Sequence, residues 1–253
     1  MDLGLKGRRA LVTGGTKGIG RAIADCFAGE GADVAICARN AAEVETAVTD
    51  LRGTGVKAYG QALDVADGPA LRGFVDASAA ALGGLDMIVA NVSALAIGQN
   101  EAAWRAGFET DLMGAVLLVE AAMPHLERSG AASITFISSV SGREIDFAAG
   151  AYGAMKAALV HYAQGLAFQL AGKGIRANTV SPGNTYFAGG VWARIEQENP
   201  ALFAQALALN PTGRMGKPEE MARPTVFLAS PAASFVTGTN LVIDGALTRG
   251  VQL

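Results

Sequence analysis

A tyrosine and a lysine four positions apart could carry proton-transfer chemistry. Tyr152 and Lys156 lie in a segment with a helical pattern, so both side chains project from one helical face. A nearby ammonium stabilises the phenolate form of a tyrosine, which can then act as a general acid or base near neutral pH. Ser139 lies 13 residues before Tyr152, and a hydroxyl there can hydrogen-bond a substrate oxygen as charge develops. Taken alone, the Tyr–Lys pair also fits an ordinary helix surface.

A glycine-rich turn follows the first strand pattern. Gly14, Gly18 and Gly20 have the spacing G-x-x-x-G-x-G. Residues without a Cβ permit a tight turn and let the backbone approach a pyrophosphate closely. The next helix would offer the phosphates its unpaired N–H groups and partial positive charge. The turn therefore predicts a dinucleotide site, although three glycines alone also fit a plain strand–helix turn.

The end of the second strand distinguishes the two nicotinamide dinucleotides. An acid there would bind a ribose 2′-hydroxyl, whereas a base would accept a 2′-phosphate. The sequence has Arg39 and no acid at this point, and Lys17 adds a positive charge in the glycine turn. Arginine pairs with phosphate in a bidentate manner. We therefore expect NADP(H) in preference to NAD(H); otherwise Arg39 is a solvated loop charge.

Alternating strand and helix patterns must position these residues. Short apolar strands are expected at Arg9–Thr13, Asp33–Ala38, Lys57–Ala62, Leu85–Asn91, Ser133–Ser138, Ala177–Ser181 and Asn240–Ile243. Helices are expected at Gly18–Glu30, Ala41–Gly53, Pro69–Leu82, Glu101–Arg128 and Ala151–Ala171, with two more stretches between Val191 and Ala229. This alternation predicts an α/β fold with a doubly wound parallel sheet covered by helices on both faces. Ligands of such a sheet bind at the carboxyl ends of its strands.

Composition narrows the classes of partner. Hydrophobic residues make up 51% of the 253 residues and charged residues 17%, which argues against disorder. The net charge is −3 and the positive charges are scattered, so no nucleic-acid surface is expected. No uncharged apolar run reaches about 18 residues and no secretory pattern opens the chain, so we expect no membrane span and a cytoplasmic location. The two cysteines have no metal-ligand spacing, and we expect no metal.

Four motifs in order carry a family resemblance. They are T-G-x-x-x-G-I-G at 13–20, S-S-x-x-G at 138–142, Y-x-x-x-K at 152–156 and S-P-G at 181–183. Across nearly its whole length the chain resembles the short-chain dehydrogenase/reductase family, in particular members similar to 3-oxoacyl-acyl carrier protein reductases. The resemblance implies a single Rossmann-type domain of about seven strands over residues 1–253, with a substrate lid around 186–212.

The resemblance also implies a reaction. Hydride passes between the nicotinamide C4 and a carbonyl carbon, Tyr152 supplies or removes the proton on oxygen, and Ser139 orients the carbonyl. Lys156 holds the ribose hydroxyls and tunes Tyr152. The enzyme would thus be an NADP-dependent alcohol dehydrogenase or carbonyl reductase. Members with the C-terminal pattern seen at 238–245 are commonly tetramers, so we expect a homotetramer.

Further positions match the family's cofactor contacts. Asp64 and Val65 match an adenine contact, Asn91 lies beneath the adenosine ribose, and Thr185 follows the S-P-G loop beside the nicotinamide. The complete set assigned to the cofactor is Gly14, Thr16, Lys17, Gly18, Ile19, Gly20, Arg39, Asp64, Val65, Asn91, Tyr152, Lys156 and Thr185.

Two departures from the family pattern affect the site. Asp111 stands where the family has an Asn that holds a water linked to the active-site lysine. An Asp could hold a water too, but it also places negative charge near Lys156. It is either a tolerated polar replacement with a catalytic role or the mark of a weakened, non-redox protein. Phe187 replaces a family Thr, so Thr185 would have to contact the cofactor instead.

The segments expected around the substrate are largely apolar and partly aromatic. The residues assigned to the substrate pocket are Ser141, Phe147, Phe187 and Trp192. They predict a hydrophobic ketone or secondary alcohol as the small-molecule substrate, with a 3-oxoacyl thioester as one specific case, although several also fit core or interface positions. The alternative function is a redox-inactive NADP(H)-binding sensor or assembly protein. The intact Ser139, Tyr152 and Lys156 favour the enzyme.

Overall fold

Seven parallel strands form the central sheet of the computed structural model, which describes residues 1–251. Their order across the sheet is β3-β2-β1-β4-β5-β6-β7. The chain winds outward from β1 to β3 and then returns to place β4 beside β1, which opens a crevice between their carboxyl ends. The strands are β1 Arg9–Thr13, β2 Asp33–Ala38, β3 Ala58–Ala62, β4 Met87–Ala90, β5 Ser133–Ile137, β6 Arg176–Pro182 and β7 Asn240–Ile243.

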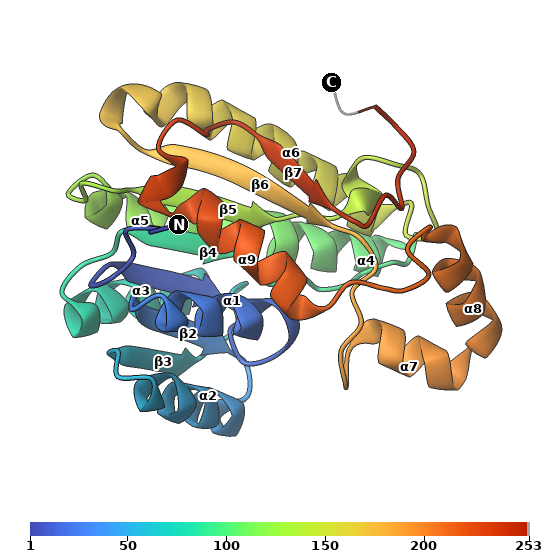
Figure 1. Cartoon of the computed structure of the whole chain (residues 1–253), viewed down its shortest axis with the longest axis horizontal. Helices are drawn as coiled ribbons and strands as arrows, with labels where there is room; N and C mark the ends of the chain where they lie inside the picture. The colour runs from blue at the N-terminus through green and yellow to red at the C-terminus, as the bar shows by residue number, and fades with distance from the viewer. Residues whose placement is uncertain (252–253) are drawn as a thin grey trace.

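Helices cover both faces of this sheet (Figure 1). Those packed on one face are α1 Gly18–Gly29, α2 Ala41–Gly53 and α9 Pro218–Ala229. Those on the other are α3 Gly68–Leu82, α5 Gly114–Leu126 and α6 Ala151–Leu170, with α4 Glu101–Gly107 leading into α5. The predicted doubly wound α/β fold is confirmed.

The strands read as continuous apolar runs because both of their faces are buried. In β1, Leu11 enters the core beneath α3 and α5, whereas Ala10 and Val12 enter the core beneath α1 and α9. Ile36 of β2 belongs to the second core and Cys37 to the first. Except in two regions, the predicted bounds of strands and helices agree with the structure to within two residues.

The single helix predicted over Glu101–Arg128 is wrong. The structure divides it into α4, a π-helical turn at Phe108–Met113, and α5, which ends at Leu126. A π turn takes an extra residue per turn and leaves the apolar period of its neighbours almost unchanged, so the sequence pattern does not reveal it. Asp111 lies in this turn and is buried.

The two helical stretches predicted between Val191 and Ala229 are three helices, α7 Val191–Glu198, α8 Pro200–Leu209 and α9. Asn199 ends α7 and caps α8, because its side chain accepts a hydrogen bond from the backbone N–H of Leu202. Pro200 then takes the first helical position, where a missing N–H costs nothing. In Figure 1, α7 and α8 stand beyond the carboxyl ends of the strands.

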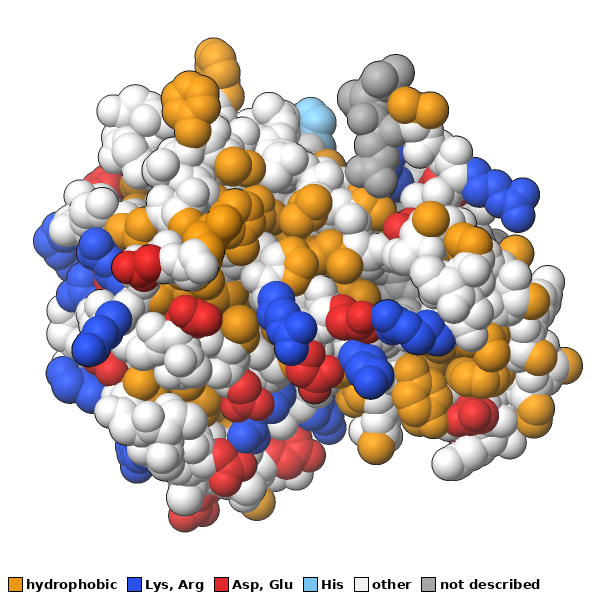
Figure 2. Space-filling view, viewed as in Figure 1, with side chains coloured by type: hydrophobic (Ala, Val, Ile, Leu, Met, Phe, Trp, Pro, Cys, Tyr) orange, Lys and Arg blue, Asp and Glu red, His pale blue; other side chains and the backbone are white. Residues whose placement is uncertain are grey.

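Charged side chains of both signs are mixed over the face formed by α1, α2 and α9 (Figure 2). The pairs Arg21–Asp25 and Arg21–Asp50 lie on this face. Within residues 1–251, no helix combines the length and apolar character that crossing a membrane requires.

A buried carboxylate ties the amino ends of β1 and β4 together. Asp86 is fully buried and accepts hydrogen bonds from Arg9 Nε at 2.8 Å and from the Ser129 hydroxyl at 2.6 Å. Burial raises the pKa of Asp86, but the hydrogen bonds from Arg9 and Ser129 outweigh it, and the net pKa is lowered. The ionised carboxylate therefore stabilises the folded state.

Asp86→Asn should lower the free energy of unfolding by about 2–3 kcal/mol at pH 7. Because the folded-state pKa is depressed, the contribution of Asp86 is present above the unfolded pKa of about 4 and is lost as the pH falls through the folded value. Urea titrations at pH 7 and pH 3 should therefore show the gap between wild type and variant narrowing in acid. Asp50→Asn, which breaks an exposed pair, should cost less than about 1 kcal/mol at both pH values. A gap that widens in acid would contradict this account.

Candidate active site

A cavity of about 640 Å³ opens at the carboxyl ends of the strands, beside the crevice between β1 and β4. Its wall combines the glycine turn, the ends of β4, β5 and β6, one side of α6 and the start of α7. The predicted site residues that line it are Lys17, Ile19, Arg39, Asn91, Ser139, Ser141, Phe147, Tyr152, Lys156, Thr185, Phe187 and Trp192.

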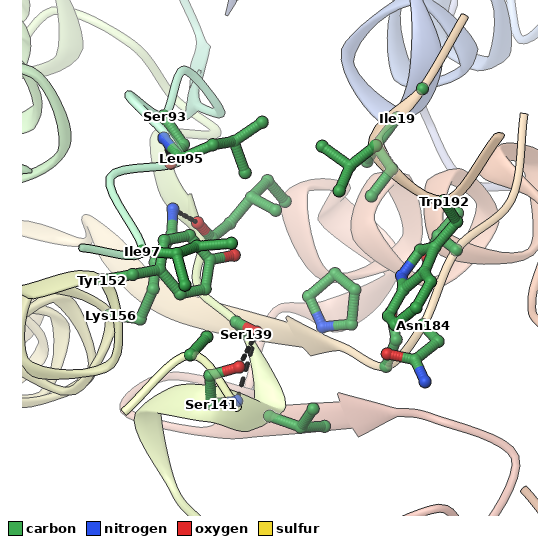
Figure 3. Close-up of a pocket in the computed structure, with 18 of the residues that line it drawn as sticks. Ile19, Ser93, Leu95, Ile97, Ser139, Ser141, Tyr152, Lys156, Asn184 and Trp192 are labelled. Carbon is green, nitrogen blue, oxygen red and sulfur yellow. Dashed lines mark hydrogen bonds between the residues drawn. The ribbon is translucent and has the colours of Figure 1, made fainter. Parts of the chain in front are cut away.

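Tyr152 and Lys156 lie side by side on the α6 wall of this cavity (Figure 3). The Lys156 ammonium is 5.6 Å from the centre of the Tyr152 ring and donates a hydrogen bond to the Ile137 carbonyl at 3.1 Å. Lys156 is only 2% exposed. The spacing of four residues therefore places both side chains on one wall of the cavity, as the sequence predicts.

Asp111 contacts Lys156 directly. Its Oδ1 lies 3.2 Å from the lysine Nζ, and the two side chains are 1% and 3% exposed. The other oxygen, Oδ2, accepts a hydrogen bond from the Ala94 backbone N–H at 2.8 Å. The carboxylate thus forms a buried ion pair with the ammonium that also faces Tyr152. The negative charge of Asp111 partly neutralises the positive charge of Lys156.

Ser139 is held at the end of β5 by a short turn packed on α6. Its hydroxyl accepts a hydrogen bond from the Ser141 backbone N–H at 3.2 Å. The neighbouring Ser138 hydroxyl donates to the Lys156 carbonyl at 2.7 Å, and a Cβ on Gly142 would lie 2.7 Å from the carbonyl carbon of Lys156. These contacts fix the hydroxyl of Ser139 relative to the helix that carries Tyr152.

The glycine turn has the form that a pyrophosphate requires. A Cβ on Gly20 would lie 2.2 Å from the Gly14 carbonyl oxygen, so the close approach of the two segments depends on glycine there. No side chain of the described residues caps the start of α1, where Lys17 is the capping residue. Its first N–H groups are therefore free to bind an anion at the edge of the cavity.

Phe187 reaches across the cavity to the glycine turn. Gly18 has φ +57°, and a Cβ there would lie 2.5 Å from the Phe187 ring. The ring therefore lies directly on Gly18. Thr185 also lines the cavity, and its hydroxyl donates to the Gly183 carbonyl at 3.1 Å. The sequence motif did not reveal this contact between positions far apart in the chain.

A family model described as enoyl-(acyl carrier protein) reductase matches residues 14–248. Isoepoxydon dehydrogenase of Penicillium expansum is 42% identical over 256 residues, with 100% of this chain and 99% of the relative covered. A short chain dehydrogenase from Burkholderia cenocepacia, solved in complex with NADP, is 33% identical with a TM-score of 0.84, covering 96% of this chain and 98% of that one. The chain belongs to the short-chain dehydrogenase/reductase family.

A second solved member of this family, a short chain oxidoreductase from Pseudomonas aeruginosa, is described as NADPH bound and as containing an atypical catalytic center. It is 31% identical with a TM-score of 0.88 and covers 96% of this chain and 98% of its own. The present short-chain dehydrogenase/reductase is accordingly an oxidoreductase, and a redox-inactive sensor or assembly protein is not favoured.

Other predicted cofactor residues of this short-chain dehydrogenase/reductase lie behind or beside the cavity wall. Gly14, Gly18 and Gly20 form the turn itself, and Asp111, which was predicted as a catalytic residue, lies behind Lys156. Asn91 lines the cavity, and its amide donates to the Thr13 carbonyl at 3.0 Å, which ties β4 to the turn.

Asp64 and Val65 follow β3 and do not line the cavity. Asp64 is exposed, and its carboxylate accepts a hydrogen bond from the Ala66 N–H at 3.0 Å. Val65 is 5% exposed and packs in the core.

Glu43 is a neighbour of the glycine turn that the sequence analysis missed. Its carboxylate accepts from the Thr16 hydroxyl at 3.1 Å and lies 3.5 Å from Lys17 Nζ. Glu43 lies in the first turn of α2, which Asn40 caps, and no local sequence signal links that position to the glycine turn. The turn thus carries one acid beside its lysine.

Proposed function

We propose that this enzyme transfers a hydride between NADP(H) and a ketone or secondary alcohol, with Tyr152 as general acid and base. The observation that carries the proposal is one cavity that joins the Tyr152–Lys156 pair to two cations, Lys17 and Arg39. The last residue of β2 is Ala38, and no acid follows until Glu43. The NADP and NADPH complexes of the two solved relatives support the choice of cofactor.

The residues present fit this dinucleotide. The glycine turn and the free N–H groups of α1 would hold the pyrophosphate, Lys17 and Arg39 the 2′-phosphate, and Lys156 the ribose hydroxyls. Asp64, Val65, Asn91 and Thr185 are proposed to complete the site. When bound, NADP(H) supplies or accepts the hydride at its nicotinamide.

The protein's own part in the reaction is proton transfer and orientation. Ser139 donates a hydrogen bond to the substrate oxygen, and Tyr152 gives that oxygen its proton during reduction or removes it during oxidation. The Lys156 ammonium faces the Tyr152 ring and would hold the ribose hydroxyls beside it, and Asp111 holds Lys156 in place.

The carbon skeleton of the substrate is proposed to lie against an apolar wall. Trp192 is 7% exposed and packs edge-on against Phe147, with ring centres 5.5 Å apart. We propose that residues 186–212, which include α7 and α8, act as the substrate lid, since Trp192 and Ala206 form a small core together. A compact, mainly hydrophobic ketone fits this wall.

Assembly and location follow the family expectation. We propose that the enzyme is a cytoplasmic homotetramer. Light scattering coupled to size exclusion should then give a mass of four chains of 25.7 kDa each.

Arg39→Asp should reverse the preference for NADPH over NADH, by roughly 100-fold in the ratio of kcat/KM values, because it exchanges a phosphate partner for a ribose-hydroxyl partner. Dissociation constants of both cofactors, measured by fluorescence titration, should change in the same sense. Lys57→Asp makes the same charge change at the amino end of β3 and should leave the ratio unaltered. A variant that keeps a strong preference for NADPH would remove Arg39 from the 2′-phosphate site.

A further inference from the structure

A hydrogen-bonded chain leads from the reacting centre to a carboxylate that the proposed reaction does not use. The Ser139 hydroxyl donates to the Ser141 hydroxyl at 3.3 Å (Figure 3). The Ser141 hydroxyl donates to Asp146 Oδ2 at 2.6 Å. The second oxygen of Asp146 accepts from the Ala148 backbone N–H at 2.8 Å. Both serines line the cavity, and Asp146 lies half-buried behind them.

The carboxylate fixes the direction of the hydroxyl groups. An ionised carboxylate has no proton to donate, so the single hydroxyl proton of Ser141 is committed to Asp146 in a short, charge-assisted bond. The lone pairs of Ser141 then face Ser139 and the cavity. Ser141 can accept a hydrogen bond from a bound molecule but has no proton left to give it.

The carboxylate is also free of competing cations. Within residues 1–251, no Lys, Arg or His nitrogen lies within ion-pair distance of Asp146. Its acceptor strength is therefore directed to Ser141 and the Ala148 N–H. A half-buried carboxylate arranged in this way polarises Ser141 and makes its oxygen a better acceptor.

We propose that Ser141, held by Asp146, recognises a second hydroxyl of the substrate beside the reacting carbonyl, so that the preferred substrates are α-hydroxyketones and the matching vicinal diols. This deepens the proposed function and rests on it. When the substrate binds, Ser139 turns its proton from Ser141 to the carbonyl oxygen, and a hydroxyl on the adjacent carbon donates to Ser141, two residues along the turn. Phe147 and Trp192 cover the rest of the skeleton.

The same geometry disfavours groups that only accept. An ether oxygen placed at Ser141 would face lone pairs without a proton between them. Leaving such a pair unsatisfied costs about as much as a lost hydrogen bond, or roughly tenfold in kcat/KM. The site therefore discriminates by the direction of a hydrogen bond as well as by size.

The test compares 2-hydroxycyclohexanone with 2-methoxycyclohexanone as substrates for NADPH-dependent reduction. Wild type should favour the hydroxyketone about tenfold in kcat/KM. Asp146→Asn should bring this ratio toward one, because the amide can donate to Ser141 and release the hydroxyl proton toward the cavity. Since the ratio is compared across variants, the intrinsic reactivities of the two ketones cancel.

Two further variants complete the experiment. Ser141→Ala should also bring the ratio toward one, and it keeps the test decisive if Asp146→Asn does not fold. Glu144→Gln makes the same chemical change in the same loop and should keep the wild-type ratio. An unchanged ratio in Ser141→Ala, or in a folded Asp146→Asn, overturns the inference even though the ketones are reduced. If wild type reduces neither these ketones nor cyclohexanone, the proposed function itself fails.

Discussion

Replacing Tyr152 with Phe should lower kcat about a thousandfold while NADPH still binds. The change removes only the phenolic oxygen, so the ring and its contact with the Lys156 side chain remain. No other described group of the α6 wall combines a titratable hydroxyl with a buried ammonium 5.6 Å from its ring. Reduction would then depend on proton transfer from solvent.

The matched control is Tyr162→Phe on the same helix. Tyr162 is partly buried against Phe136 of the core, with ring centres 5.5 Å apart, and it does not line the cavity. Its loss should leave kcat within about twofold of wild type, as expected for a residue outside the chemistry. Rates with NADPH and a ketone, together with a cofactor titration of each variant, provide the comparison. More than a tenth of wild-type kcat in Tyr152→Phe would remove Tyr152 from its proposed role.

Asp111→Ala should lower the free energy of unfolding by about 3–5 kcal/mol. The substitution leaves the Lys156 ammonium, which is 2% exposed, without its carboxylate partner at 3.2 Å. It also removes the acceptor for the Ala94 N–H. An uncompensated buried charge is among the costliest single defects in a protein interior. Urea denaturation at pH 7 measures the loss.

Two variants separate the buried charge from the other effects of removing Asp111. Asp111→Ala/Lys156→Met removes both charges and should recover much of the lost stability, since an apolar side chain replaces the stranded ammonium. Asp111→Asn keeps the size and an oxygen for the Ala94 N–H, so it should lose less than Asp111→Ala. A loss below about 1 kcal/mol in Asp111→Ala would mean that Lys156 reaches water or another acceptor.

Local signals in the sequence were sufficient for most elements of the fold. Asn40 and the glycine at position 53 bracket α2, and the structure begins and ends that helix at the predicted residues. The π turn at Phe108–Met113 escaped because its register depends on tertiary contacts, including the pairing of Asp111 with Lys156. Helix propensity and hydrophobic periodicity depend on the local sequence and do not reveal a partner that is distant in the chain.

The sequence likewise predicted one part of the candidate site and did not predict another. Tyr152 and Lys156 could be paired from their spacing, because four residues always share a helical face. The contact of Phe187 with Gly18 and that of Glu43 with Thr16 join segments brought together only by the folded sheet. Asp146 lies five residues from Ser141, but the loop that turns it back follows no regular period. Contacts of this kind can be identified only from the three-dimensional structure.

The Arg9–Asp86 pair lies at the amino ends of β1 and β4, whereas Tyr152 lies beside the carboxyl ends of the strands. Strands of about five residues separate these two ends by roughly 16 Å. Substitutions that strengthen or weaken the hydrogen bonds of Asp86 can therefore change stability without moving the reacting groups. For a biocatalyst this separates thermal stability from kcat. Substitutions at the amino ends of the strands should change the rate of thermal inactivation and leave the kcat of the folded enzyme the same.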